Sequence, residues 1–290
     1  MRSRGFIGPS KRAAGIAGIA LVILAFASLS ARADTLAVIP VGQEMSAIYA
    51  EQVENSLKDR VALLDRELIL AAFSSFKFEH PTNLRSSDAA AAGSAIGCDA
   101  FLIIEAGVNR RSSSARPVYF EAYAALFLVD SSSGRLLKWF GPRVEADTER
   151  ESVARLLETA PSFAREILDL TAAAKSKKNS DAAAVAIETL PESPEKGLQP
   201  PIPYRRIKPK YTEEAERLGI AASVEILVDI GEDGSIKRIE IVRWAGYGLE
   251  GSVENAVRSM NWRPAYRGGR PIAMRVLLRY NFKRLAESRN

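Results

Sequence analysis

The stretch SVEILVDIGEDGSIKRIEIV, residues 223–242, decides the fold of the carboxy-terminal part of the chain. Its first half alternates apolar with other residues, which is the period of a strand with one buried face. The second half alternates less strictly, and Asp233-Gly234 between the halves is a strong signal for a tight turn. The stretch therefore predicts a hairpin with Val224 and Ile226 on one buried face and a register slip in its second strand.

Helical segments flank this hairpin. Before it, Thr212 offers an N-cap oxygen, and Gly219 suits a left-handed helix end. After it, SVENAVRSMNW, residues 252–262, places apolar residues on one helical stripe. RPIAMRVLLRYNF, residues 270–282, alternates again and predicts a last strand. The sum is a small α+β unit of order helix, strand, strand, helix, strand, whose sheet has a free edge.

Between the hairpin and the second helix, Gly246-x-Gly248-x-x-Gly251 has the spacing of a dinucleotide-binding loop. Such a loop needs a parallel β-α-β unit and an acidic residue about 20 positions downstream. Here the preceding element is the second arm of a hairpin, and no Asp or Glu occurs between Glu254 and Glu287. We therefore interpret the motif as a flexible turn and expect no nucleotide.

The first residues have the three-part layout of an export signal. Basic residues precede an apolar run at 13–29, and the small-residue site Ala31-Arg32-Ala33 follows. We expect cleavage after Ala33, which would place the mature chain outside the cytoplasm. The alternative is an uncleaved anchor, because about 17 apolar residues lie at the lower limit for spanning a bilayer.

Residues 34–174 predict an α/β domain with helices packed on a mixed sheet. A β-like run at 35–41 is followed by helical spacing over about 46–64, and strand-like runs come later, at 99–108 and 117–130. A last amphipathic segment, about 148–174, closes the domain.

Residues 175–203 are rich in charged residues, small residues and proline, a composition that is typical of a linker. We expect the domain before it and the unit at 204–284 to move independently, with a short tail at 285–290.

Composition excludes several classes of site. The chain has one cysteine, Cys98, and one histidine, His80, which excludes an internal disulfide framework and Cys-based metal sites. With a single histidine we expect neither zinc chemistry nor Ser/His/Asp catalysis. We expect no metal, no cofactor and no enzyme activity, and an envelope enzyme stays as a weaker alternative. Aromatic residues alternate with arginines near the carboxy terminus, as on a nucleic-acid platform, but the export signal argues against nucleic acid.

The segments PKYTEEAERLGI, VDIGEDGSIKRIEIV, SVENAVRSMNWRPA and GGRPIAMRVLLRYNF resemble the carboxy-terminal domain of the TonB energy-transducer family, at about residues 204–284. Trp262 stands where the family has phenylalanine, Thr212 where it has proline and Gly251 where it has an acidic helix cap. The structural motif of the family falls on Tyr211, Gly219, Asp233, Gly234, Trp262, Pro264, Gly269 and Pro271, and of these only Trp262 differs from the family's residue.

This resemblance implies binding rather than chemistry. Domains of the family engage an extended segment of an outer-membrane receptor by adding it to their sheet, where edge N–H and C=O groups supply the hydrogen bonds. If the last strand is that edge, its arginines would favour acidic segments or only keep the edge soluble. The residues expected to contact a periplasmic or outer-membrane partner are Arg275, Val276, Leu277, Arg279 and Asn281.

Residues 35–170 resemble, over short apolar pieces such as AIGCDAFLIIEAGV, the curli-secretion lipoprotein and the amino-terminal domain of TolB. That resemblance implies an envelope domain used for assembly. The whole chain then predicts a periplasmic protein linked to outer-membrane transport or assembly. The alternative is an anchored transducer in the inner membrane that couples a proton-driven motor to outer-membrane receptors, which would require residues 13–29 to stay in the membrane.

Overall fold

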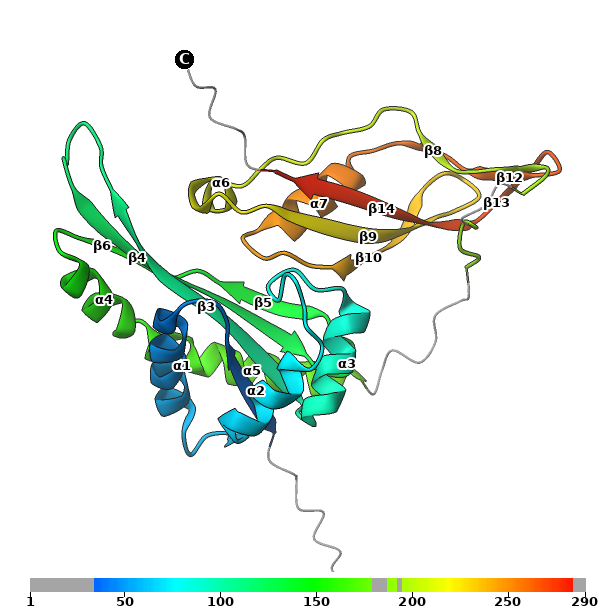
Figure 1. Cartoon of the computed structure of the whole chain (residues 1–290). Helices are drawn as coiled ribbons and strands as arrows, with labels where there is room; N and C mark the ends of the chain where they lie inside the picture. Colours follow the sequence, from blue (N-terminus) through cyan, green and yellow to red (C-terminus); the bar gives the residue numbers. More distant parts are fainter. Residues whose placement is uncertain (1–33, 179–186, 192–194, 284–290) are drawn as a thin grey trace, which may run out of the picture. The chain divides into compact units, whose positions relative to one another are not determined.

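A mixed sheet organises the amino-terminal region (Figure 1). The computed structural model describes residues 34–178, 187–191 and 195–283, so the predicted export signal and the predicted tail at 285–290 lie outside the described residues. The strands run in the order β2-β1-β3-β4-β5, with β6 also paired to β4. Their bounds are β1 (Thr35–Pro40), β2 (Ala62–Leu63), β3 (Ala100–Arg111), β4 (Tyr119–Asp130), β5 (Leu136–Phe140) and β6 (Arg143–Ala146).

Parallel and antiparallel pairs meet at β3, which confirms the predicted mixed sheet. β1 is parallel to both β2 and β3, whereas β3 and β4 pair antiparallel along their full length. The two faces of β1 alternate as a buried strand requires: Leu36 and Val38 belong to one hydrophobic cluster, and Ala37 and Ile39 to another.

Helices cover both faces of this sheet. The cluster with Leu36 and Val38 contains residues of α1 (Glu44–Leu57), α4 (Glu149–Leu157) and α5 (Ala160–Lys178). The opposite cluster contains residues of α2 (Arg66–Ser74) and α3 (Ser86–Ile96). Thr148 caps α4 by accepting a hydrogen bond from the Glu151 backbone, and Asp65 caps α2 in the same way through Leu68.

Two predicted helices differ in extent from the structure. The helix expected over 46–64 ends at Leu57, because Lys58 leaves the helical conformation and Asp59 has φ 66°. The amphipathic segment at 148–174 is two helices instead of one. Pro161 lies in the first turn of α5, the place where a helix accepts proline, and it could not lie inside one continuous helix.

The carboxy-terminal region contains a three-stranded sheet of order β10-β9-β14 and two smaller pairings, β8 with β11 and β7-β12-β13. The element order confirms the predicted α+β unit. Its elements are β7 (Leu198–Gln199), β8 (Ile202–Pro203), α6 (Glu213–Leu218), β9 (Ala222–Ile230), β10 (Ile236–Arg243), α7 (Leu249–Arg258), β11 (Trp262–Arg263), β12 (Ala265–Arg267), β13 (Arg270–Ile272) and β14 (Met274–Phe282).

The predicted hairpin is confirmed as β9 and β10. Val224 and Ile226 are fully buried, and the predicted register slip is two irregularities, between Ile236 and Arg238 and between Ile241 and Arg243. The predicted last strand is divided at Ala273 into β13, which pairs with β12, and β14, which pairs with β9.

Parts of the predicted linker belong to folded structure. Helix α5 continues to Lys178, and β7 and β8 pair with β12 and β11. Residues 188–190 contact β14 through backbone hydrogen bonds. The structured carboxy-terminal region therefore begins before Tyr204, because β7 and β8 are paired with strands of that region.

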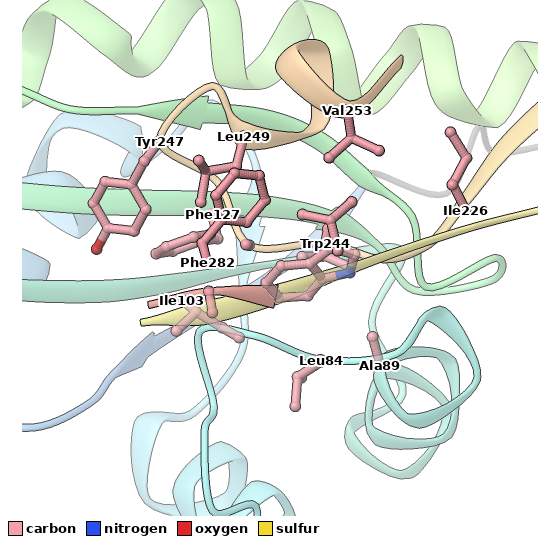
Figure 2. Packing of buried hydrophobic residues seen from close by; sticks show 14 of the residues in the cluster. Leu84, Ala89, Ile103, Phe127, Ile226, Trp244, Tyr247, Leu249, Val253 and Phe282 are labelled. Carbon is pink, nitrogen blue, oxygen red and sulfur yellow. The ribbon is translucent and has the colours of Figure 1, made fainter. Parts of the chain in front are cut away.

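One hydrophobic cluster contains residues from both regions (Figure 2). The Phe127 ring of β4 lies 5.7 Å from the Trp244 ring and 5.8 Å from the Tyr247 ring, between centroids. The indole N–H of Trp244 donates to the carbonyl oxygen of Gly134 at 3.0 Å. The structure therefore joins the two regions that were expected to move independently, and separating them would expose these aromatic side chains to water.

Candidate functional site

Strand β14 lies at one edge of the β10-β9-β14 sheet. The backbone of Arg275 points away from β9, because its N–H donates to Glu188 and its carbonyl accepts from Leu190, both at 2.8 Å. Backbone groups of an antiparallel strand alternate in direction, so those of Leu277, Arg279 and Asn281 point the same way. Over the described part of the chain, these three residues show no backbone partner on that side.

The side chain of Arg275 is held by β9. Its Nε and Nη2 lie 2.6 and 2.8 Å from the two carboxylate oxygens of Asp229, whose side chain is 4% exposed. This two-point ion pair raises the pKa of Arg275. Of the two roles expected of the edge arginines, attraction of acidic segments is less favoured for Arg275, because Asp229 already pairs with its charge. A glutamate at this position would also face Asp229 and disturb the sheet.

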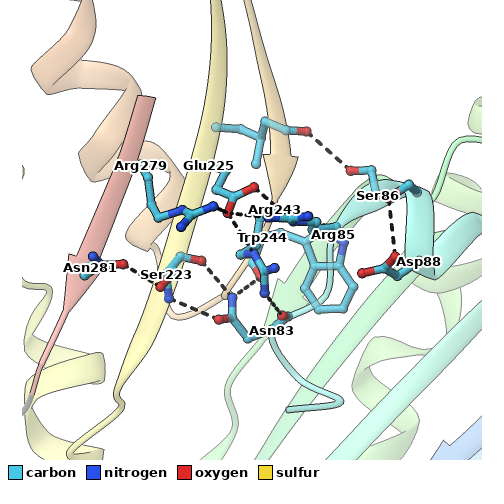
Figure 3. A network of polar contacts seen from close by, with 12 residues as sticks. Asn83, Arg85, Ser86, Asp88, Ser223, Glu225, Arg243, Trp244, Arg279 and Asn281 are labelled. Carbon is cyan, nitrogen blue, oxygen red and sulfur yellow. Dashed lines mark hydrogen bonds and ion pairs between the residues drawn. The ribbon is translucent and has the colours of Figure 1, made fainter. Parts of the chain in front are cut away.

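Arg279 belongs to a cluster of guanidinium groups around Glu225 (Figure 3). The Glu225 side chain is 3% exposed, and its carboxylate lies 2.8 Å from Arg279, 3.2 Å from Arg85 and 3.4 Å from Arg243. Burial alone would raise the pKa of Glu225, but the hydrogen bond from Arg85 and the positive charges outweigh burial and lower it. Since Arg85 precedes α3, the cluster joins the two regions of the chain.

The remaining residues of the predicted contact set lie in different surroundings. Val276 is 4% exposed and opposite Val228, so it belongs to the core and cannot contact a partner. Leu277 is 51% exposed, which leaves it free to make apolar contact. The Asn281 side chain accepts a hydrogen bond from the Ser223 hydroxyl at 2.7 Å.

The predicted motif residues around α6 shape the module. The Thr212 hydroxyl caps α6 by accepting from Ala215 N–H at 3.3 Å, and Gly219 ends it with φ 65°. Both predictions are confirmed. The Tyr211 hydroxyl donates to the Ile220 carbonyl, and its ring stacks 5.9 Å from Phe282 at the end of β14. These contacts hold one end of β14 against the helix.

Asp233 and Gly234 form the hairpin turn. The Asp233 carboxylate accepts from the Ser235 backbone at 3.0 Å, and Gly234 has φ 76°. A Cβ at Gly234 would lie 2.3 Å from the Trp262 carbonyl, so glycine is needed here for conformation and for space. The turn is thereby fixed against the strand that follows α7.

The other motif residues support the turn that leads into β14. Trp262 is 5% exposed and pairs with Pro203, and Pro264 follows in the connection to β12. Gly269 has φ 81° between β12 and β13, and Pro271 lies opposite Tyr266. These residues position β14 but offer no side chain at its open edge.

The glycine motif connects β10 to α7, as a turn between hairpin and helix is expected to do. Gly246 and Gly248 have φ of 74° and 75°, and Gly251 already lies inside α7. The half-buried Glu250 carboxylate accepts from the backbone N–H groups of Ala245 and Gly246 at 2.5 and 2.7 Å. Burial raises the pKa of Glu250. The N–H groups that a phosphate would need are therefore engaged by the chain itself.

Sequence reasoning missed the occupant of the β14 edge. Glu188 forms a two-point ion pair with Arg267, at 2.7 and 2.9 Å, and Leu190 packs against the shared hydrophobic cluster. The only local sign of an ordered segment is a pair of apolar residues, Ile187 and Leu190, within the charged linker. Such a short signal does not say which edge the segment joins.

Across residues 34–178, 187–191 and 195–283, the structure has no helix long and apolar enough to cross a membrane. Within the same ranges, no group of three or more His, Cys, Asp or Glu residues is arranged to hold a metal ion.

Residues 207–284 match the family model described as Gram-negative bacterial TonB protein C-terminal, which confirms the resemblance found in the sequence. No curated protein matches the chain. Among solved structures, the TonB C-terminal domain of Pseudomonas aeruginosa is 25% identical, with 33% of this chain and 93% of that chain covered and a TM-score of 0.26.

Two lipoprotein structures also align with the chain. One from Neisseria meningitidis is 14% identical, with 47% of this chain and 99% of that chain covered and a TM-score of 0.34. A minor lipoprotein from Acinetobacter baumannii is 9% identical, with 49% and 95% covered and a TM-score of 0.26. We draw no functional conclusion from these structural likenesses.

Proposed function

We propose, from the match of residues 207–284 to the TonB C-terminal family and from the open edge of β14, that the chain is an envelope protein that binds an extended segment of another protein. The segment adds to β14 as a further strand. The observation that carries this proposal is the backbone of Arg275, which already exchanges two hydrogen bonds with an extended segment of the chain.

The edge has the physical properties that strand addition requires. Backbone groups of Leu277, Arg279 and Asn281 point outward, so an added strand gains hydrogen bonds without unfolding the sheet. Leu277 adds exposed apolar surface. Arg279 is 52% exposed although it is paired with Glu225, so it attracts acidic side chains only weakly.

The proposed partners are protein segments in the periplasm or the outer membrane, in line with a role in outer-membrane transport or assembly. We propose that the chain has no enzyme activity and binds no cofactor, nucleotide or nucleic acid. We also propose that the export signal is cleaved after Ala33. A mature mass that includes residues 13–29 would contradict cleavage and favour the anchored transducer, which would also contact an inner-membrane motor.

A crosslinking experiment tests the proposal. A photo-reactive residue at Asn281 in the full chain is expected to capture a partner segment in the envelope. Leu277→Pro removes one outward N–H without touching the ladder to β9, and we expect it to lower capture by about tenfold or more. Leu277→Ala keeps the N–H and is the matched control. Equal capture by the proline variant, with circular dichroism unchanged, would contradict strand addition at β14.

A further inference from the structure

A segment of the predicted linker lies on the β14 edge in parallel orientation. Thr189 pairs with Arg275, the Arg275 N–H donates to the Glu188 carbonyl, and the Leu190 N–H donates to the Arg275 carbonyl. This is the hydrogen-bond pattern of one parallel bridge. The edge is therefore partly occupied by the chain itself.

Side chains hold this segment at both ends of the bridge. The Glu188 carboxylate forms its two-point ion pair with Arg267, and that hydrogen bond lowers the pKa of Glu188. Glu195 also lies 3.2 Å from Arg267. On the other side of Thr189, Leu190 packs against the hydrophobic cluster. The segment thus has a fixed register on β14.

The attachment is nevertheless weak. Besides the packing of Leu190 and the contact of Glu195, it rests on one bridge and on an ion pair whose members, Glu188 and Arg267, are 49% and 40% exposed. Exposed ion pairs contribute little to stability because water screens them. Its strength comes from the tether, which gives a linked segment an effective concentration on the order of millimolar.

We propose that residues 188–190 are an internal occupant of β14, which an incoming strand must displace to gain the backbone groups of Arg275. This inference rests on the proposed function, since it takes β14 as the receiving edge. One N–H cannot donate well to two strands at once, so the internal segment and the partner compete. The apparent affinity of the partner is therefore its affinity for the free edge multiplied by the fraction of molecules in which the segment is released.

Peptide binding to the full chain tests the competition. The probe is a fluorescent peptide of sequence VAIETLPES, which copies residues 185–193. The release variant Glu188→Lys with Leu190→Pro loses the ion pair and the N–H donor. We expect it to bind the probe about tenfold more tightly than the unchanged chain. Thr189→Ala keeps both backbone hydrogen bonds and is expected to bind like the unchanged chain.

Hydrogen exchange gives an independent readout. The amide of Arg275 is expected to exchange faster in the release variant, and to regain protection when the probe is added. Equal probe affinity for the unchanged chain and the release variant would overturn the internal occupant while leaving the receiving edge intact. Probe binding to none of the variants, or unchanged exchange at Arg275, would overturn it as well.

A third variant separates this inference from the proposed function. Leu277→Pro is added to the release variant, so that the edge beyond Arg275 loses its next N–H donor. We expect probe binding to fall about tenfold. If the probe still binds the triple variant as tightly, it does not extend along β14 beyond Arg275, and the proposed strand addition at Leu277 fails together with the inference that rests on it.

Discussion

The side-chain amide of Asn83 forms two hydrogen bonds with the backbone of Ser223, in the way that the backbone of a neighbouring strand would. The Asn83 Oδ1 accepts from the Ser223 N–H at 3.0 Å, and its Nδ2 donates to the Ser223 carbonyl at 2.8 Å. The same Nδ2 donates to the Trp244 carbonyl at 2.6 Å. One amide, before α3, thereby satisfies backbone groups of β9 and of the loop after β10.

Asn83→Ala removes the partner of the buried Trp244 carbonyl and of the part-buried Ser223 N–H and carbonyl. We expect the free energy of unfolding to fall by about 1–3 kcal/mol, because unsatisfied buried polar groups cost that much. Urea unfolding followed by tryptophan fluorescence measures the change. Ser87→Ala, on the exposed side of α3, is the control and is expected to change stability by less than about 0.5 kcal/mol. Equal stability of both variants would contradict the role of Asn83.

Two glycines of the same motif are expected to respond oppositely to alanine. Gly246 has φ 74°, and a Cβ there would lie 2.5 Å from the Phe127 ring and 2.7 Å from the Trp139 ring. Gly246→Ala should therefore destabilise the chain by about 1–3 kcal/mol. Gly251 lies in α7 with no atom near its Cβ position, so Gly251→Ala should stabilise by about 0.5–1 kcal/mol. Thermal unfolding distinguishes the two.

The Glu225 cluster predicts a loss of stability in acid. Because the folded pKa of Glu225 lies below its ordinary value of 4.5, the stability it contributes is present above that value and is lost as pH falls through the folded pKa. Glu225→Gln should cost about 1–3 kcal/mol at pH 7, less than a fully buried pair because Arg279 is half exposed.

The difference in unfolding free energy between this variant and the unchanged chain should shrink below pH 4.5. Urea titrations at several pH values from 7 down to about 3 follow it. A difference that stays constant over this range would show that Glu225 keeps its ordinary pKa in the folded chain.

Proline substitutions at two successive positions of β14 test which backbone N–H groups point toward β9 and which point away from it. The N–H of Leu278 is expected to donate to β9, because Leu278 is one position out of phase with Leu277. Leu278→Pro should therefore cost about 3 kcal/mol or more, whereas Leu277→Pro should leave the fold intact. Circular dichroism and thermal unfolding compare the two, and similar losses in both would show that the assigned directions are wrong.

Much of the carboxy-terminal fold follows from local sequence. The turn at Asp233-Gly234, the cap at Thr212 and the helix end at Gly219 depend on conformations that few residues adopt, so their positions in the sequence predict the elements. The mixed sheet of the amino-terminal region also follows from periodicity, whereas the ends of α1 and the break before α5 do not.

The candidate site could be predicted only in part. Period-two alternation indicated the last strand and separated Val276 from Arg275 and Leu277. The contact set implied by the family resemblance nevertheless included Val276, although only its two neighbours have outward backbone groups. The ion pairs of Arg275 and Arg279 depend on the register with β9. Arg85 reaches Glu225 across 140 positions, and no local pattern carries such information.

The burial of Trp244, Ala245 and Tyr247 beneath β4 and β5 affects how the carboxy-terminal region can be handled. In the whole chain these side chains are 1%, 1% and 3% exposed. A fragment cut at residue 204 loses Phe127 and Trp139, so it presents an aromatic patch to solvent. Such patches drive self-association and adhesion to unrelated proteins. Pull-downs with the excised region would therefore capture unrelated proteins as well as specific partners, so such experiments should use the intact chain.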